Sequence, residues 1–188
     1  MIENLIGILG STNEEVPYRK HVFGILQRFS YLKQAQVQMI SFGMIPIIFK
    51  IFRNEGEELT FNSIQYLMGL IMNLAINREW ISSFEKHKTE ILTLLLKYID
   101  VDDVDIRGYV NGTLYVLLQM SSFKNEAGKY KLETTVMNLL EKYELKLEAI
   151  ESEEEDERAE DYNLAIKQYN YILKRLEESP NNDSQFCQ

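Results

Sequence analysis

The chain contains two histidines, His21 and His87, whose side chains are the ones best suited to acid–base chemistry near neutral pH. They lie in different repeats of the pattern described below, and neither adjoins a motif that would make it a catalytic base. The sequence also has no glycine-rich phosphate loop, no GxSxG motif and no HExxH motif. We therefore predict no catalytic residue and expect that the protein is not an enzyme.

Metal ligation is disfavoured as well. Cys187 is the only cysteine, which excludes a cysteine-based zinc site and a disulfide within one chain. The carboxylates of residues 151–161 are densely packed along the sequence and lack the EF-hand spacing with its central glycine. We predict no metal site, no cofactor and no small-molecule substrate.

A third set of side chains is suited to binding rather than to catalysis. His21, Tyr66 and Tyr109 follow one another at intervals of 45 and 43 residues. The same intervals relate three glycines, which are Gly24, Gly69 and Gly112. A helical period in the low to middle forties is typical of armadillo or HEAT repeats. Such repeats stack into a solenoid with a long binding surface, so the pattern favours a protein-interaction scaffold.

The elements that must position these residues are predicted to be helices. With 3 prolines, 9 glycines and little alternating hydrophobicity, the chain indicates an all-α fold. We predict an armadillo/HEAT-like right-handed superhelical solenoid of about three complete repeats, with a partial unit at each end. In the middle repeat, residues 60–63 offer helix caps, residues 64–75 form a long buried helix that ends at Asn77, and a short helix runs through Trp80. In the repeat before it, Gly43 breaks the chain and Pro46 begins the next helix.

The domain prediction places one repeat domain at residues 1–178. An acidic loop at 144–161 separates its last two helices, and residues 179–188 form a disordered tail. The acidic run is either a solvated loop, in part a frayed helical extension, or a docking segment for a basic partner. Both interpretations stay open.

The charge of the chain bears on its partners and its location. The net charge is −9, and residues 144–161 hold ten acidic against two basic side chains, which leaves about −1 for the rest. Without a basic stripe we expect no nucleic-acid binding. The longest apolar run, near Met44–Phe49, is far too short for a membrane span, and the N-terminus has no basic signal-peptide region. We expect a cytoplasmic protein with protein partners and no membrane contact.

Two features of the long helices are candidates for the binding surface. Glycine inside a helix costs about 1 kcal/mol relative to alanine, so the three glycines indicate either close approach between stacked helices or a groove kept shallow for a partner. Asn73 resembles one rung of the asparagine ladder that clamps the peptide main chain in importin-alpha and beta-catenin. The equivalent positions hold Arg28 and Val116. The ladder is broken, and the row His21, Tyr66 and Tyr109 is the better candidate, with plain packing as its alternative.

Several runs of sequence resemble one known family. These are VFGILQRFS at 22–30, LIMNL at 70–74, YVNGTLY at 109–115 and ILKRLEE at 172–178. They are similar to the armadillo region of the LisH domain-containing armadillo repeat-containing protein 9 family, and the likeness extends over roughly residues 16–178. The LisH and coiled-coil regions expected upstream are absent, which fits a fragment, and the acidic run precedes the last helix instead of following the repeats.

The resemblance implies a function that composition and spacing do not. It implies a non-enzymatic scaffold at the basal body, the centriole and the ciliary tip. There it would act in cilium assembly and stability, with TOG-domain microtubule-associated proteins as partners. The alternative is a generic cytosolic armadillo adaptor with no ciliary role. The candidate partner-binding residues are His21, Tyr66, Asn73 and Tyr109, which we expect to be accessible on one face.

Replacing Tyr66 or Tyr109 by Ala tests that expectation. If the row binds partners, each substitution weakens partner binding and leaves the melting temperature nearly unchanged, because tyrosines at binding hot spots owe their energy to the complex. If the tyrosines belong to the core, each substitution costs about 3–5 kcal/mol. Thermal melts of both variants, followed by circular dichroism, distinguish the two results.

Overall fold

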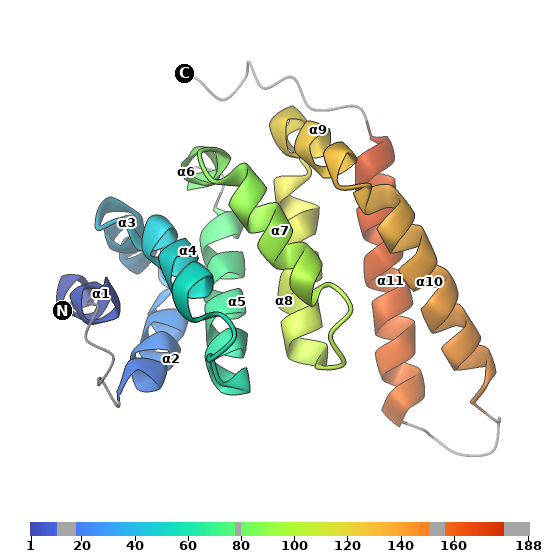
Figure 1. Ribbon diagram of the computed structural model, residues 1–188, viewed down its shortest axis with the longest axis horizontal. Coiled ribbons are helices and arrows are strands. Elements are labelled where there is room, and N and C mark those ends of the chain that lie inside the picture. The colour runs from blue at the N-terminus through green and yellow to red at the C-terminus, as the bar shows by residue number, and fades with distance from the viewer. Residues whose placement is uncertain (11–17, 78–79, 151–156, 179–188) are drawn as a thin grey trace. The chain divides into compact units, whose positions relative to one another are not determined.

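The computed structural model describes residues 1–10, 18–77, 80–150 and 157–178 of the chain. Within these ranges the chain forms helices and no strand (Figure 1). The helices belong to two compact units, Met1–Ile91 and Leu92–Gln188. The predicted all-α fold is confirmed, and the predicted tail at 179–188 and the middle of the acidic run lie outside the described residues.

Unit 1, which is Met1–Ile91, contains long and short helices in the order predicted for armadillo-like repeats. Its helix α2 packs against α5, α1 contacts α2, α3 and α4, and α5 contacts α6. The bounds are α1 (Ile2–Gly10), α2 (Arg19–Phe29), α3 (Lys33–Ser41), α4 (Met44–Glu55), α5 (Phe61–Ile76) and α6 (Ile81–Glu85).

Local sequence explains where these helices begin and end. Thr60 caps α5, and its side chain accepts a hydrogen bond from the backbone N–H of Ser63 at 3.3 Å. Asn77 follows the last residue of α5 in an extended conformation. Gly43 adopts the left-handed conformation between α3 and α4, with φ of 75°, and Pro46 lies in the first turn of α4. These four positions confirm the boundaries predicted for this part of the chain.

The core of unit 1 is apolar and centred on α5. Leu67, Leu70 and Leu74 of α5 are fully buried, together with Phe23 and Leu26 of α2. Burying a side chain of this kind contributes roughly 1.5–3 kcal/mol. The contact between α2 and α5 is therefore a main source of stability in this unit.

The helices also bear on the question of membrane insertion. Among the described residues, no single helix is both long enough and apolar enough to cross a membrane. Helices α3 and α4 reach the required length and composition only as a pair, and the pair is bent by 68° at its break.

Unit 2, which is Leu92–Gln188, is built around its two longest helices. Helices α10 and α11 lie side by side, and α11 also packs against α8 (Figure 1). The bounds are α8 (Val104–Leu117), α9 (Ser121–Lys129), α10 (Leu132–Glu148) and α11 (Glu157–Glu177), while α7 (Lys88–Tyr98) crosses the division between the units.

The acidic segment is shorter than the loop predicted at 144–161. Helix α10 continues to Glu148, and α11 begins at Glu157. The apolar and aromatic stripe of α10 extends into this stretch, because Tyr143 is buried and Leu147 half-buried. Packing of that stripe outweighs the repulsion between like charges, so the ends of the predicted loop are helical.

A buried arginine joins the helices of unit 2. Arg107 on α8 is 1% exposed and forms an ion pair with Asp161 on α11. Its guanidinium also donates a 3.1 Å hydrogen bond to the backbone oxygen of Val101 and lies 5.2 Å from the ring centroid of Tyr143 on α10. A buried cation is stable only when it is paired and hydrogen-bonded. Arg107 meets this requirement with groups from three segments of the unit.

Two tyrosines complete this cluster. Tyr143 and Tyr169 are buried with ring centroids 5.7 Å apart, a separation typical of favourable aromatic pairs. The hydroxyl of Tyr169 donates a hydrogen bond to the backbone oxygen of Ile99 at 2.9 Å. Burial raises the pKa of Tyr169, so this hydroxyl remains a donor.

Replacing Asp161 by Asn tests the role of the buried ion pair. The substitution leaves the guanidinium of Arg107 buried without its anion, which is expected to lower the free energy of unfolding by about 3 kcal/mol. Glu160→Gln on the same helix is the control, because Glu160 is exposed, and a change within about 0.5 kcal/mol is expected there. Urea denaturation of both variants gives the comparison, and equal effects would contradict the structural role of the pair.

Candidate functional site

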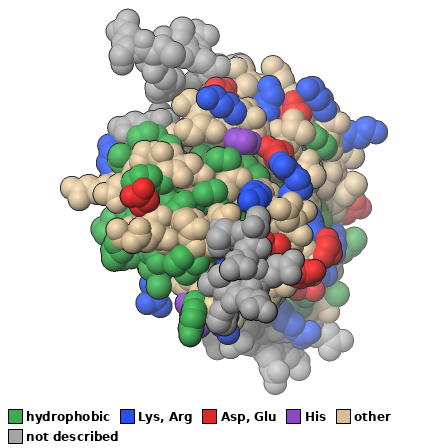
Figure 2. Space-filling view, turned by 60° about the vertical axis from the view of Figure 1, so that its left-hand side comes forward, with side chains coloured by type: hydrophobic (Ala, Val, Ile, Leu, Met, Phe, Trp, Pro, Cys, Tyr) green, Lys and Arg blue, Asp and Glu red, His purple; other side chains and the backbone are tan. Residues whose placement is uncertain are grey.

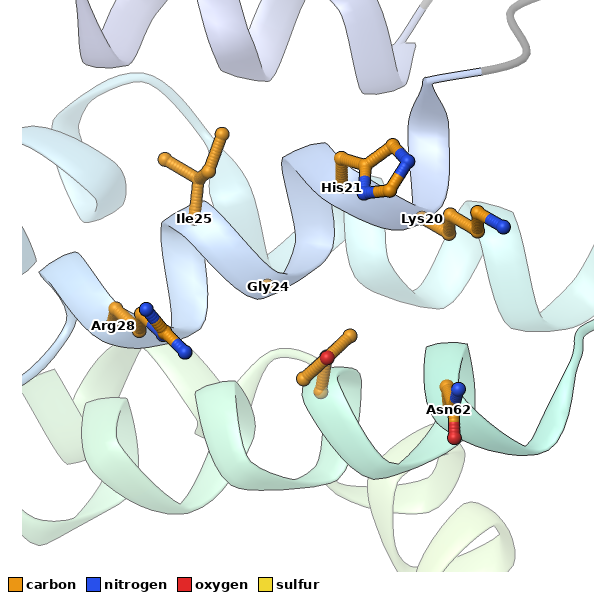
Figure 3. Close-up of a pocket in the computed structure, with 7 residues that line it drawn as sticks. Lys20, His21, Gly24, Ile25, Arg28 and Asn62 are labelled. Carbon is orange, nitrogen blue, oxygen red and sulfur yellow. The ribbon is translucent and has the colours of Figure 1, made fainter.

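A groove between α2 and α5 is the candidate site. It has a volume of about 400 Å³. Helix α2 lines it with Lys20, His21, Gly24, Ile25 and Arg28, and α5 contributes Asn62 and Tyr66. Figure 3 shows Lys20 and Arg28 at the two ends of this stretch of α2, with Gly24 between them and Asn62 on the facing helix.

The floor of the groove depends on Gly24. A Cβ atom at this position would lie 3.3 Å from two ring atoms of Tyr66. That is closer than ordinary van der Waals contact, so the absence of a side chain at Gly24 lets the ring of Tyr66 approach α2. At this glycine the interpretation of close approach between stacked helices is supported.

The charges in the groove have one sign. Lys20, His21 and Arg28 are exposed, and none of the described residues that line the groove is acidic. Within the described residues, neither Lys20 nor Arg28 has an ion-pair partner, whereas Arg19 beside them pairs with Glu55 at 2.5 Å. The described residues therefore leave both cations without a counter-charge. The arrangement is suited to binding carboxylates.

The structure brings together two of the four residues predicted to bind partners. His21 and Tyr66 both line the groove, where His21 is exposed and Tyr66 is half-buried. Tyr109 is half-buried on α8 and belongs to unit 2. A binding role for these three residues stays a prediction.

The expected accessibility of Asn73 is wrong. Asn73 is only 9% exposed, and its side-chain amide donates a 2.8 Å hydrogen bond to the hydroxyl of Ser30. Gln36 on α3 adds bonds to the backbone oxygens of Ser30 and Asn73, at 2.7 and 3.1 Å. The asparagine joins α5 to the end of α2 instead of facing a partner. Repeat spacing alone did not reveal this, because the residues that cover Asn73 come from other helices.

The second histidine has a structural environment of its own. The His87 ring lies 2.6 Å from a carboxylate oxygen of Glu90 and packs against Phe49, with ring centroids 5.2 Å apart. The hydrogen bond with His87 holds the pKa of Glu90 below its ordinary value. Across the described ranges, no cluster of His, Cys, Asp and Glu is arranged to hold a metal ion.

A wider view shows how charge and apolar surface are distributed. On the face seen in Figure 2, apolar side chains gather toward the left and charged side chains of both signs toward the right.

Sequence reasoning missed four lining residues, which are Lys20, Ile25, Arg28 and Asn62. One signal was present, because Lys20, Gly24 and Arg28 follow at intervals of four residues and so form one ridge of a helix. The intervals of 45 and 43 residues directed attention to aromatic positions only. They also equated Arg28 with Asn73, although the structure exposes the first and buries the second.

Comparison with known proteins places the chain among armadillo-repeat proteins. The family model for the ARM repeats of LisH domain-containing protein ARMC9 matches residues 39–153. The human protein of that name is 27% identical over 133 residues, which is 71% of this chain and 16% of the human one. The cattle protein is 30% identical over 125 residues, and the zebrafish protein 27% identical over 129 residues. These matches cover 66% and 69% of this chain, and 19% and 16% of the two relatives.

The chain therefore spans about a fifth or less of the length of the curated relatives it matches. The matched residues 39–153 include part of both units. They include Asn62 and Tyr66 of the groove, whereas the lining residues of α2 precede the matched range.

Substituting two asparagines of α5, one buried and one at the groove, distinguishes a structural role from a binding role. Asn73→Ala removes a buried hydrogen bond and is expected to lower the free energy of unfolding by about 1–2 kcal/mol. Asn62→Ala removes an exposed side chain and is expected to change it by less than about 0.5 kcal/mol. Chemical denaturation of the two variants measures the difference. A larger loss for Asn62→Ala would show that the groove residue is part of the core.

Proposed function

Because the chain belongs to the ARM-repeat family of LisH domain-containing protein ARMC9, we propose that it is a protein-interaction scaffold of the ciliary basal body, centriole and ciliary tip. There it acts in cilium assembly and stability. Its partners are proteins, TOG-domain microtubule-associated ciliary proteins among them. The proposal has a structural part, the scaffold, and a cellular part, the cilium.

The scaffold part is carried by one observation, which is the open groove between α2 and α5. Its cations are unpaired within the described residues, and Ile25 adds an exposed apolar side chain. Such a surface combines polar contacts with apolar area, as protein-binding sites do. The groove offers recognition chemistry, so a scaffold accounts for it better than an enzyme.

The cellular part is supported by the family. The YVNGTLY run at 109–115 lies within the matched residues 39–153, and it is the most specific of the runs that carry the resemblance. Asn111 of that run is buried, and its amide donates a 2.9 Å hydrogen bond to the side chain of Gln168 on α11. The run therefore has a packing role, and the ciliary role rests on family membership.

Localisation in a ciliated cell tests the cellular part. The tagged protein is expected at centrioles, the basal body and the ciliary tip, with stained centrioles and axonemes as references. The tag expressed alone is the control, and it is expected to be diffuse. A diffuse cytosolic signal for the intact protein would contradict the ciliary role and favour the alternative, a generic cytosolic adaptor.

A further inference from the structure

The cations of the α2–α5 groove identify the charge of its ligand. Lys20 and Arg28 carry positive charge without an ion-pair partner in the described part of the chain. Asn62 lies in the first turn of α5, where the helix dipole adds a positive potential. Glu57 and Glu58 precede α5 in the sequence, but neither lines the groove. An anionic group is therefore the complement of this surface.

The spacing of the two cations indicates an extended ligand. Lys20 and Arg28 are two intervals of four residues apart on one helix, a distance of about 12 Å at a rise of 1.5 Å per residue. In an extended peptide, residues i and i+4 are about 13 Å apart, and residues i, i+2 and i+4 point to the same side. Two carboxylates separated by three residues would thus reach both cations.

The centre of the groove has different chemistry. Between the two cations, the ring of Tyr66 lies against Gly24 and forms the wall of the groove. Ile25 lies beside this point and is 42% exposed. A side chain that meets Tyr66 and Ile25 gains most if it is apolar. The position between the two carboxylates is the one that faces this centre.

We propose that the α2–α5 groove binds an extended acidic segment of another protein, in which an apolar residue lies midway between two carboxylates spaced by four positions. Lys20 and Arg28 each bind one carboxylate, while Tyr66 and Ile25 contact the apolar side chain. This inference rests on the proposed scaffold function and gives the partner's binding segment a defined pattern.

Other occupants fit the groove less well. Nucleic acid needs several neighbouring phosphate contacts, whereas this chain has a net charge of −9 and the described lining of the groove offers only Lys20 and Arg28 for such contacts. The acidic run of a second copy has charge, but its described part is helical at Glu144 and Glu148 instead of extended. Both alternatives enter the test as competing ligands.

The test uses the 188-residue chain and a blocked, fluorescent heptapeptide. The peptide has Glu at positions two and six, Phe at position four and Ser elsewhere. Fluorescence polarisation is expected to show saturable binding that weakens as salt is raised from about 50 to 300 mM. Replacing both Glu by Gln, or Phe by Ser, is expected to weaken binding at least about fivefold, since each removes one of the proposed contacts.

The protein variants locate the site. Lys20→Gln with Arg28→Gln is expected to weaken binding about tenfold, because two charge-assisted contacts are lost. The control is Lys86→Gln with Lys174→Gln, which removes two exposed cations outside the groove and has the same net charge. Its affinity is expected to stay within about twofold of the parent's. Circular dichroism melts of both double variants verify that they are folded, as expected for changes at exposed positions.

Several results would overturn the inference. One is equal weakening by the two double variants, which would indicate attraction by net charge alone. Another is tighter binding of a peptide with the two Glu adjacent, which would exclude the spacing. Tighter binding of the peptide 144–161 or of oligothymidine at the groove would assign the site to a second copy or to nucleic acid.

The two proposals fail separately. Absence of peptide binding to the parent chain overturns the groove inference, whatever the protein's location in the cell. Conversely, a diffuse cytosolic signal of the tagged protein contradicts the ciliary role even if the peptide binds at the groove. The tagged chain carrying Lys20→Gln and Arg28→Gln is also localised, and its distribution is compared with that of the Lys86→Gln and Lys174→Gln control.

Discussion

The structure of unit 1 depends on the burial of α5, a helix that is apolar on most of its circumference. Such a helix is unstable in water by itself and needs neighbours on several sides. Helix α2 supplies the largest of these contacts. The two helices approach closely at Gly24, where the ring of Tyr66 meets the bare backbone. The groove lies along this same contact, since its described lining residues come from α2 and α5.

In unit 2, the contact that buries one helix against another includes more polar side chains. Helix α11 covers α8, and the contact is tied by the buried ion pair of Arg107 and Asp161. The ring of Tyr143 on α10 also packs against the guanidinium of Arg107, so this buried cation contacts side chains of both α10 and α11. A buried ion pair adds little stability compared with apolar packing, but it is strongly destabilising when one partner is removed. It thus fixes which residues of α8 and α11 face each other.

Much of this architecture could be predicted from the sequence. The caps at Thr60 and Gly43 and the end of α5 at Asn77 follow from local chemistry, and the structure has them where the sequence indicates. The groove was only half predictable. Periodicity found His21 and Tyr66, but the environment of Asn73 depends on Ser30 and Gln36, which no repeat interval relates to it. Burial of a polar residue is decided by tertiary neighbours, and those are not local in sequence.

The same limit explains the residues that were missed. Lys20 and Arg28 carry no motif, and surface lysines and arginines are common on any helix. What makes them notable is the absence of acidic neighbours, and only the packed structure shows it for the described residues. The acidic run illustrates the opposite case. Its charge suggested a loop, while the apolar stripe that continues past Tyr143 keeps the chain helical to Glu148.

The most direct test of the central claim is a nuclear magnetic resonance titration of the ¹⁵N-labelled chain, whose mass of 22.1 kDa suits the method. The ligand is an acidic peptide of the proposed spacing. The account predicts that shift changes concentrate at Lys20, Gly24, Arg28 and Tyr66, with α10 and α11 unaffected. Changes centred on the buried Asn73 or on the helices of unit 2, with none at the groove, would contradict it.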